Sequence, residues 1–196
     1  MDNAGKIKFL DLLRSTKREG IEDLICWVES TDFFFAPAST RYHDSFEGGL
    51  LQHSLRVYDW LKALADFYSN SPLATGSLKE LTSDSVVLVA LCHDFCKIGC
   101  YKTEMRWRKD QHNRWEQHPT YKFEEDFAFG GHGSKSVFLV QHFIKLTPTE
   151  AAAINCHMGA TDESPYSKTG TVFDTNPLAW LLHVADEAAS FNVKED

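Results

Sequence analysis

The sequence predicts an all-α fold that carries one inserted β-hairpin, at about residues 101–123. In most of the chain, apolar residues recur every three or four positions, which is the spacing of one face of a helix. Residues 86–92 are continuously apolar but too few to cross a membrane, so they predict a helix buried in a protein core. Only at 101–123 does the spacing change to the alternation of a strand. At 196 residues, the chain is expected to form a single domain.

The expected helices follow one another along the chain with short connections. They span residues 6–18, 21–28, 49–68, 83–99, 134–144, 148–158 and 177–190. Ser83 is a good N-cap residue, and Gly99 is expected to end the helix that begins there. The segment 147–150 (Thr-Pro-Thr-Glu) has the layout of a capping box with proline at the first helical position. Segments 31–47 and 69–82 lack a helical period and are expected to be irregular.

The predicted hairpin has an alternating pattern and a basic charge. Thr103, Met105 and Trp107 alternate with charged residues, and the alternation resumes at Trp115 after a polar turn at 110–113. This is the pattern of two strands joined by a short turn. The segment holds six basic against three acidic side chains, a charge of +3, while the whole chain carries −8 and the remainder therefore −11.

Composition and charge exclude several classes of protein. A net charge of −8 argues against a general affinity for nucleic acid, which requires basic surface. No apolar run approaches the length of a membrane-spanning helix, and the first residues lack the layout of a signal peptide. Five cysteines, an odd count, favour free thiols in a reducing compartment. We therefore expect a cytoplasmic protein with no membrane partner.

Histidines and aspartates at five separated places predict a metal centre. The pair His93-Asp94 ends the apolar helix and would carry an imidazole and a carboxylate into the interior. Buried ionisable groups are costly unless they are paired or bind a metal. Imidazole and carboxylate are common ligands of first-row transition metals. The candidate ligands are His53, His93, Asp94, His132, His157 and Asp186.

The order of these residues, H…HD…H…H…D, resembles that of the HD-domain superfamily, whose members are metal-dependent phosphohydrolases with a helical-bundle fold. The run Gly-Gly-Leu-Leu-Gln-His at 48–53 is similar to the first metal-binding helix of many such proteins. The run His-Asp-Phe-Cys-Lys at 93–97 resembles the HD-x-x-K signature. The resemblance covers residues 43–190, which would form the metal-binding core. The whole chain, residues 1–196, would form one HD domain, with N-terminal helices within residues 1–30.

This resemblance implies an enzyme that hydrolyses a phosphomonoester or phosphodiester of a small molecule such as a nucleotide. Four histidines and two aspartates suit two divalent transition-metal ions (Fe, Mn, Zn, Ni or Co), with Asp94 as the bridging and catalytic carboxylate. Lys97 is implied to face the substrate phosphate and to balance its charge. His43 is a further candidate for substrate contact. His183, one turn before Asp186, either supports a ligand from behind or competes for the ligand role.

The basic hairpin is a second candidate for substrate recognition. Arg106 and Arg108 share a strand face, and guanidinium groups donate paired hydrogen bonds to phosphate. We expect them to contact the anionic part of the substrate. The alternatives are a solvated basic face, or a homodimer contact built on Trp107 and Trp115.

Two other classes of protein share parts of this pattern. The same ligand order occurs in the mixed-valent di-iron relatives typified by myo-inositol oxygenase, which carry out dioxygen chemistry. A non-catalytic HD module would bind without turnover, but the presence of all six ligands together with Lys97 argues against it. HD-type exoribonucleases share the first helix motif, yet they carry a separate nucleic-acid-binding domain for which 196 residues leave no room.

Overall fold

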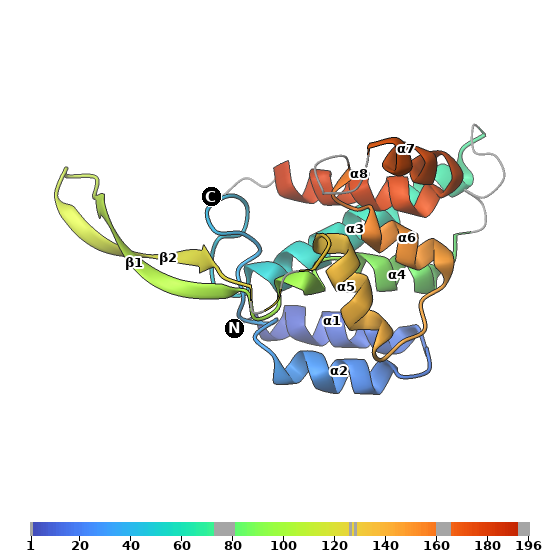
Figure 1. Ribbon diagram of the computed structural model, residues 1–196, viewed down its shortest axis with the longest axis horizontal. Coiled ribbons are helices and arrows are strands. Elements are labelled where there is room, and N and C mark those ends of the chain that lie inside the picture. Colours follow the sequence, from blue (N-terminus) through green and yellow to red (C-terminus); the bar gives the residue numbers. More distant parts are fainter. Residues whose placement is uncertain (1, 73–80, 126, 128, 160–165, 192–196) are drawn as a thin grey trace.

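The computed structural model describes residues 2–72, 81–125, 127, 129–159 and 166–191, and it shows a mostly helical body from which one antiparallel hairpin extends (Figure 1). The elements are α1 (Asn3–Ser15), α2 (Ile21–Ser30), α3 (Gly49–Asn70), α4 (Ser83–Cys92), the 3-10 helix η2 (Phe95–Lys97), β1 (Tyr101–Lys109), β2 (Trp115–Phe123), α5 (His132–Gln141), α6 (Pro148–Asn155), α7 (Tyr166–Thr175) and α8 (Pro177–Phe191). The predicted mostly helical fold with one inserted hairpin is therefore confirmed. Within the described part of the chain, no helix has the length and apolar character needed to cross a membrane.

Helix α4 is the central element of the core. All residues from Val86 to Cys92 are buried, and the helix contacts α1, α3, α6 and α8. The apolar run thus forms a buried helix, as predicted. Its predicted end at Gly99 was wrong, because Asp94 leaves the helical conformation (φ −103°, ψ 18°) and η2 follows. His93 is the last residue with helical backbone angles, Asp94 follows the break, and both side chains are buried.

Helices α5 and α6 approach each other closely where the predicted ligands lie. The capping box is confirmed: the Thr147 hydroxyl accepts from the Glu150 N–H, and the Glu150 carboxylate accepts from the Thr147 N–H. Helix α5 begins at His132, two residues earlier than predicted. A Cβ on Gly133 would lie 2.3 Å from the carbonyl oxygen of Asn155, so a glycine is required for this approach. The contact places the start of α5 beside the end of α6.

Helix α7 was not predicted from the sequence. Its segment contains Gly170 and several threonines, which are weak helix formers. Val172 and Phe173 pack against the core, and the helix contacts α8, so tertiary packing stabilises it. Of the segment 69–82 that was predicted to be irregular, residues 73–80 lie outside the described residues.

The hairpin stands away from the helical body as a two-stranded arm (Figure 1). Its register pairs Tyr101 with Phe123 at the base and Lys109 with Trp115 near the tip. The base is attached to the body where the Tyr101 hydroxyl donates to the Ala38 carbonyl at 3.1 Å. Toward the tip, the strands expose most of their side chains, including Trp115 at 64%.

Candidate metal centre

Five of the six predicted ligands converge in the protein interior. They come from α3 (His53), the end of α4 (His93 and Asp94), the segment after α6 (His157) and α8 (Asp186). The three histidines are fully buried, and Asp94 and Asp186 are only 2% and 8% exposed. Elements far apart in sequence thus place imidazoles and carboxylates together in the core.

The spacing around His53 and His93 suits a shared metal ion. The Nε2 atom of His53 lies 3.3 Å from His93 Nε2, 3.1 Å from Asp186 Oδ1 and 3.5 Å from Asp94 Oδ2. His93 Nε2 is 3.4 Å from the same Asp94 oxygen. Two ligand atoms bound about 2.1 Å from one ion are separated by roughly 3.0 Å to 3.4 Å, depending on the coordination angle. His53, His93 and Asp186 therefore form one group of donor atoms that could hold an ion, and the Asp94 carboxylate lies beside it.

The other oxygen of Asp94 faces His157. The distance from Asp94 Oδ1 to His157 Nε2 is 3.7 Å. This imidazole nitrogen is buried without a hydrogen-bond partner in the described structure. A buried polar atom without a partner is costly, and a metal ion would satisfy it. Asp94 therefore has the geometry of a bridging ligand between two positions.

His132 lies near this cluster but outside its closest groups. Its side chain is partly exposed, and Nδ1 lies 3.5 Å from the sulfur of the buried Cys96. Among the residues that the structure describes, the groups whose ligand atoms lie within 4.8 Å of one another do not include His132. It lines the same cavity as Asp94, so it is adjacent to the second position without completing it.

Backbone contacts orient two of the three buried imidazoles. His93 Nδ1 lies 2.8 Å from the Ala90 carbonyl, and His157 Nδ1 lies 2.7 Å from the Ile154 carbonyl. Because a carbonyl oxygen can only accept, each Nδ1 must carry the proton. The unprotonated Nε2 of each ring is then directed at the carboxylates, which is the arrangement that metal ligation requires.

The electrostatics of the cluster favour ionised carboxylates, and they differ between the imidazoles. Burial lowers the pKa of His93, but the charge of Asp94 outweighs it and the pKa is raised. Burial lowers the pKa of His53 to about 4, so this ring is neutral at physiological pH. Burial raises the pKa of Asp94, but the charges of Lys97 and His93 outweigh it, and the pKa lies well below its usual value. For Asp186 the neighbouring His53 imidazole likewise outweighs burial and lowers the pKa. Carboxylate and neutral imidazole are the ligand forms that bind divalent ions.

A cavity of about 770 Å³ opens onto the cluster. The charged side chains of Asp94, Asp186 and Lys97 are among the residues that line it. The Lys97 ammonium lies 2.7 Å from Asp94 Oδ2, and this pairing outweighs burial and raises the pKa of the lysine. The aromatic side chains at the wall of the cavity are those of Tyr42, Tyr101, Phe123 and Phe191. The cavity thus joins charged side chains to an aromatic wall.

The structure settles the position of His183 and adds a residue that the sequence did not indicate. His183 Nδ1 lies 2.7 Å from the backbone carbonyl of His157, and within the described residues His183 belongs to none of the groups of close ligand atoms. Asp44 was not predicted as a site residue from the sequence. In the structure it is 2% exposed and lies beside His53. His43, a predicted substrate contact, lines the cavity and lies 3.3 Å from the Asp44 carboxylate.

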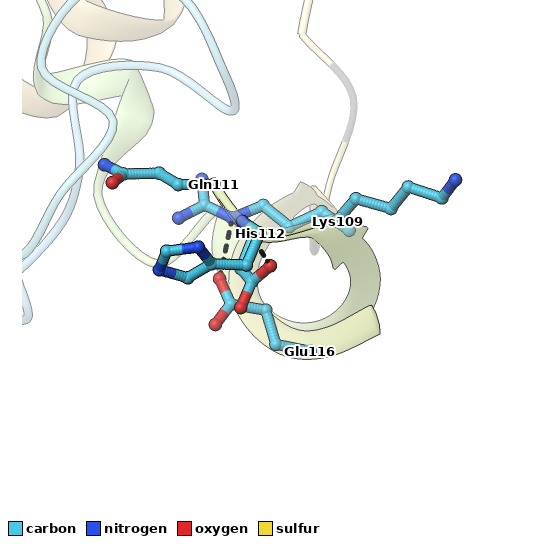
Figure 2. A pocket seen from close by; sticks show the side chains of 6 residues that line it. Lys109, Gln111, His112 and Glu116 are labelled. Atoms are coloured by element: carbon cyan, nitrogen blue, oxygen red, sulfur yellow. Dashed lines mark hydrogen bonds and ion pairs between the residues drawn. The ribbon is translucent and has the colours of Figure 1, made fainter. Parts of the chain in front are cut away.

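The structure does not bring Arg106 and Arg108 to this cavity. Both are exposed on the hairpin, where they pair with Glu104 and Glu116. A hollow at the hairpin tip is lined by Arg108, Lys109 and Glu116 among others, and Figure 2 shows the side chains around it. The hollow follows from the turn, in which the Asp110 carboxylate accepts two backbone N–H groups, and it contains no cluster of metal ligands within the described residues.

Three comparisons with known proteins found no match to this chain. No protein-family model matches the chain, and neither the curated proteins nor the solved structures contain a match. The geometry of the site therefore carries the functional argument.

Proposed function

We propose that the chain is a metal-dependent phosphohydrolase of the HD type, which cleaves a phosphomonoester or phosphodiester of a small molecule such as a nucleotide. The observation that carries the proposal is the position of Asp94. One of its oxygens faces His53 and His93, and the other faces His157. A carboxylate between two groups of buried imidazoles suits a pair of divalent ions, and such pairs are widespread in enzymes of phosphoryl transfer.

The ligand groups define two positions. His53, His93 and Asp186 would hold one ion, and His157 would hold the second together with Asp94, which lies between them. His132 lines the same cavity as Asp94. Mixed nitrogen and oxygen ligands suit Fe, Mn, Zn, Ni or Co. Bound ions of this kind supply Lewis-acid stabilisation of the phosphate and lower the pKa of a bound water.

The remaining cavity residues have roles that follow from their position. The Lys97 ammonium, held by Asp94, can pair with a phosphate oxygen and balance the charge that develops during cleavage. The aromatic wall, which includes Tyr101 and Phe123, provides an apolar surface for the organic part of the ester. A base or another planar ring would stack on such a wall.

A substrate panel tests the proposal. Phosphomonoesters, nucleotides and phosphodiesters are incubated with the metal-loaded protein, using Mn, Fe, Co, Ni, Zn and Mg in turn, and released phosphate or alcohol is measured. Asp94→Asn removes the bridging charge and should abolish turnover. Asp59→Asn is the matched control, because Asp59 is an exposed carboxylate paired with Lys8. Absence of hydrolysis across the panel, or equal hydrolysis by Asp94→Asn, would contradict the proposal.

The same panel separates hydrolysis from dioxygen chemistry, since the ligand order also suits a mixed-valent di-iron oxygenase. Each reaction is run with and without air. Hydrolysis that is independent of oxygen supports the proposal. Substrate-dependent oxygen uptake with a di-iron absorption band would contradict hydrolysis and favour the oxygenase. Stoichiometric binding of a panel compound without its turnover would indicate a binding module.

A further inference from the structure

His53 differs from the other two buried imidazoles in how it is held. His93 and His157 donate through Nδ1 to carbonyls three residues earlier, which directs Nε2 to the centre. His53 lies within α3, and its Nδ1 is buried without a hydrogen-bond partner in the described structure. Its Nε2 nevertheless faces Asp186 and His93, as a ligand atom would. Something other than a backbone carbonyl must therefore orient this ring.

The carboxylate of Asp44 lies on the Nδ1 side of His53. Its Oδ2 lies 4.0 Å from His53 Nδ1 and 3.3 Å from His43 Nδ1, and it pairs with the guanidinium of Arg56. The side chain of Asp44 is almost entirely buried. The Arg56 guanidinium holds this carboxylate in place beside His53, and within the described residues His43, Asp44 and His53 form a group of close donor atoms.

The backbone around Asp44 is built to hold it there. Asp44 adopts a positive φ of 51°, which costs free energy for a residue with a side chain. Its carbonyl accepts from the Ala38 N–H at 3.1 Å. A Cβ on Gly49 would lie 2.0 Å from that same carbonyl oxygen, so only a glycine lets the start of α3 approach it. Gly49, at the beginning of the predicted metal-binding helix, is thus required because the backbone of Asp44 lies so close to it.

We propose that Asp44 is a positioning residue for the metal centre: its carboxylate accepts the Nδ1 proton of His53 and so presents Nε2 to the ion. This inference rests on the proposed metal-dependent function. Ligating histidines commonly donate their other N–H to a carboxylate or carbonyl, which fixes the tautomer and orients the ring. All three buried imidazoles would then present Nε2 to the centre, two through carbonyls and one through Asp44.

A comparison of two variants tests this role by metal affinity. Asp44→Asn and Arg56→Gln both break the Asp44–Arg56 pair, but only the first removes the charged acceptor beside His53. Titration with Mn²⁺, with free ion counted by electron paramagnetic resonance, should show that Asp44→Asn weakens the tighter site by about 10-fold to 100-fold. Arg56→Gln should stay within about threefold of the wild type, because the carboxylate remains. Unchanged affinity in Asp44→Asn, or equal loss in both variants, would overturn the proposal.

A second measurement decides the role of Asp44 without any metal and without a variant of Asp44. The ¹⁵N chemical shifts of the metal-free wild type, with His53 assigned by comparison with His53→Gln, report which ring nitrogen carries the proton. The proposal requires the proton on Nδ1. A proton on Nε2 would overturn it. If the wild type takes up no Mn²⁺ while His53 carries its proton on Nδ1, the proposed function fails and the positioning role of Asp44 stands.

Discussion

Asp94 and Lys97 lie on consecutive turns of one short segment, and this places a fixed cation against the bridging carboxylate. The segment is short because α4 ends at Cys92 and η2 turns Lys97 back toward the cavity. Lys97 is paired with Asp94 and lines the cavity at the same time. A substrate phosphate that enters the cavity would meet this ammonium group beside the metal ligands.

We expect Lys97→Gln to lower kcat/KM by about 100-fold, because a preorganised charge at a developing oxyanion contributes that much in comparable sites. Metal content should stay close to that of the wild type, since Lys97 is not a ligand. Steady-state kinetics and elemental analysis of the same preparations test both statements. Full activity in the variant would show that the lysine only neutralises Asp94.

At the scale of elements, the approach of α5 to α6 determines how closely His132 lies to His157. A Cβ on Gly133 would contact backbone oxygens of residues 154 and 155 at 2.5 Å and 2.3 Å, so Gly133→Ala must separate the two helices. We expect a loss of roughly 1–3 kcal/mol in the free energy of unfolding, as in overpacked cores. The second metal position should also bind more weakly.

Gly170→Ala is the matched control for this change. Gly170 is also helical, but an added Cβ would have no neighbour within 4 Å. Alanine should therefore stabilise α7 by up to about 1 kcal/mol through its higher helix propensity. Chemical denaturation of both variants measures these effects. An unchanged free energy of unfolding in Gly133→Ala would mean that α5 and α6 tolerate separation.

The two hairpin arginines are not among the residues that line the cavity at the candidate metal centre. Arg106 and Arg108 are paired with glutamates on an arm that extends away from the helical body (Figure 1). We therefore expect the double variant Arg106→Gln/Arg108→Gln to leave KM within about twofold of the wild type, because uniform binding energy is lost only where a side chain touches substrate. A KM raised several-fold with little change in kcat would instead give these arginines the substrate contact that their sequence pattern suggested.

Local patterns predicted the elements better than they predicted the site. Helical period, the capping box at Thr147 and the alternation in the hairpin are short-range signals, and the structure confirms them. Helix α7 was missed because its segment lacks strong helix formers and it is stabilised by packing against α8 and the core. Asp44 carried no signal of its own, since its function depends on a contact with His53 across a turn. The predicted ligand set converged for the five buried residues, but the partly exposed His132 lies outside their closest groups.

For the whole molecule, the buried cluster links metal binding to folding. Two carboxylates and three imidazoles lie in the core, and ions that bind them in the folded state only will stabilise that state by mass action. At a metal concentration of 100 times the dissociation constant, this amounts to about 2.7 kcal/mol per site. We expect the thermal unfolding midpoint to rise on addition of Mn²⁺ or Zn²⁺ and to fall with a chelator, by scanning calorimetry. His157→Gln should reduce this rise, and Asp59→Asn should not.

The metal content of the protein tests the central claim most directly. Protein purified without chelators, loaded with one of the candidate metals and desalted, is analysed by elemental mass spectrometry together with His157→Gln. The arrangement of His53, His93, Asp94, His157 and Asp186 predicts about two ions per wild-type chain and about one in the variant. A wild-type content at or below about one would contradict the paired centre, and a content at background level would contradict the metal-dependent function as a whole.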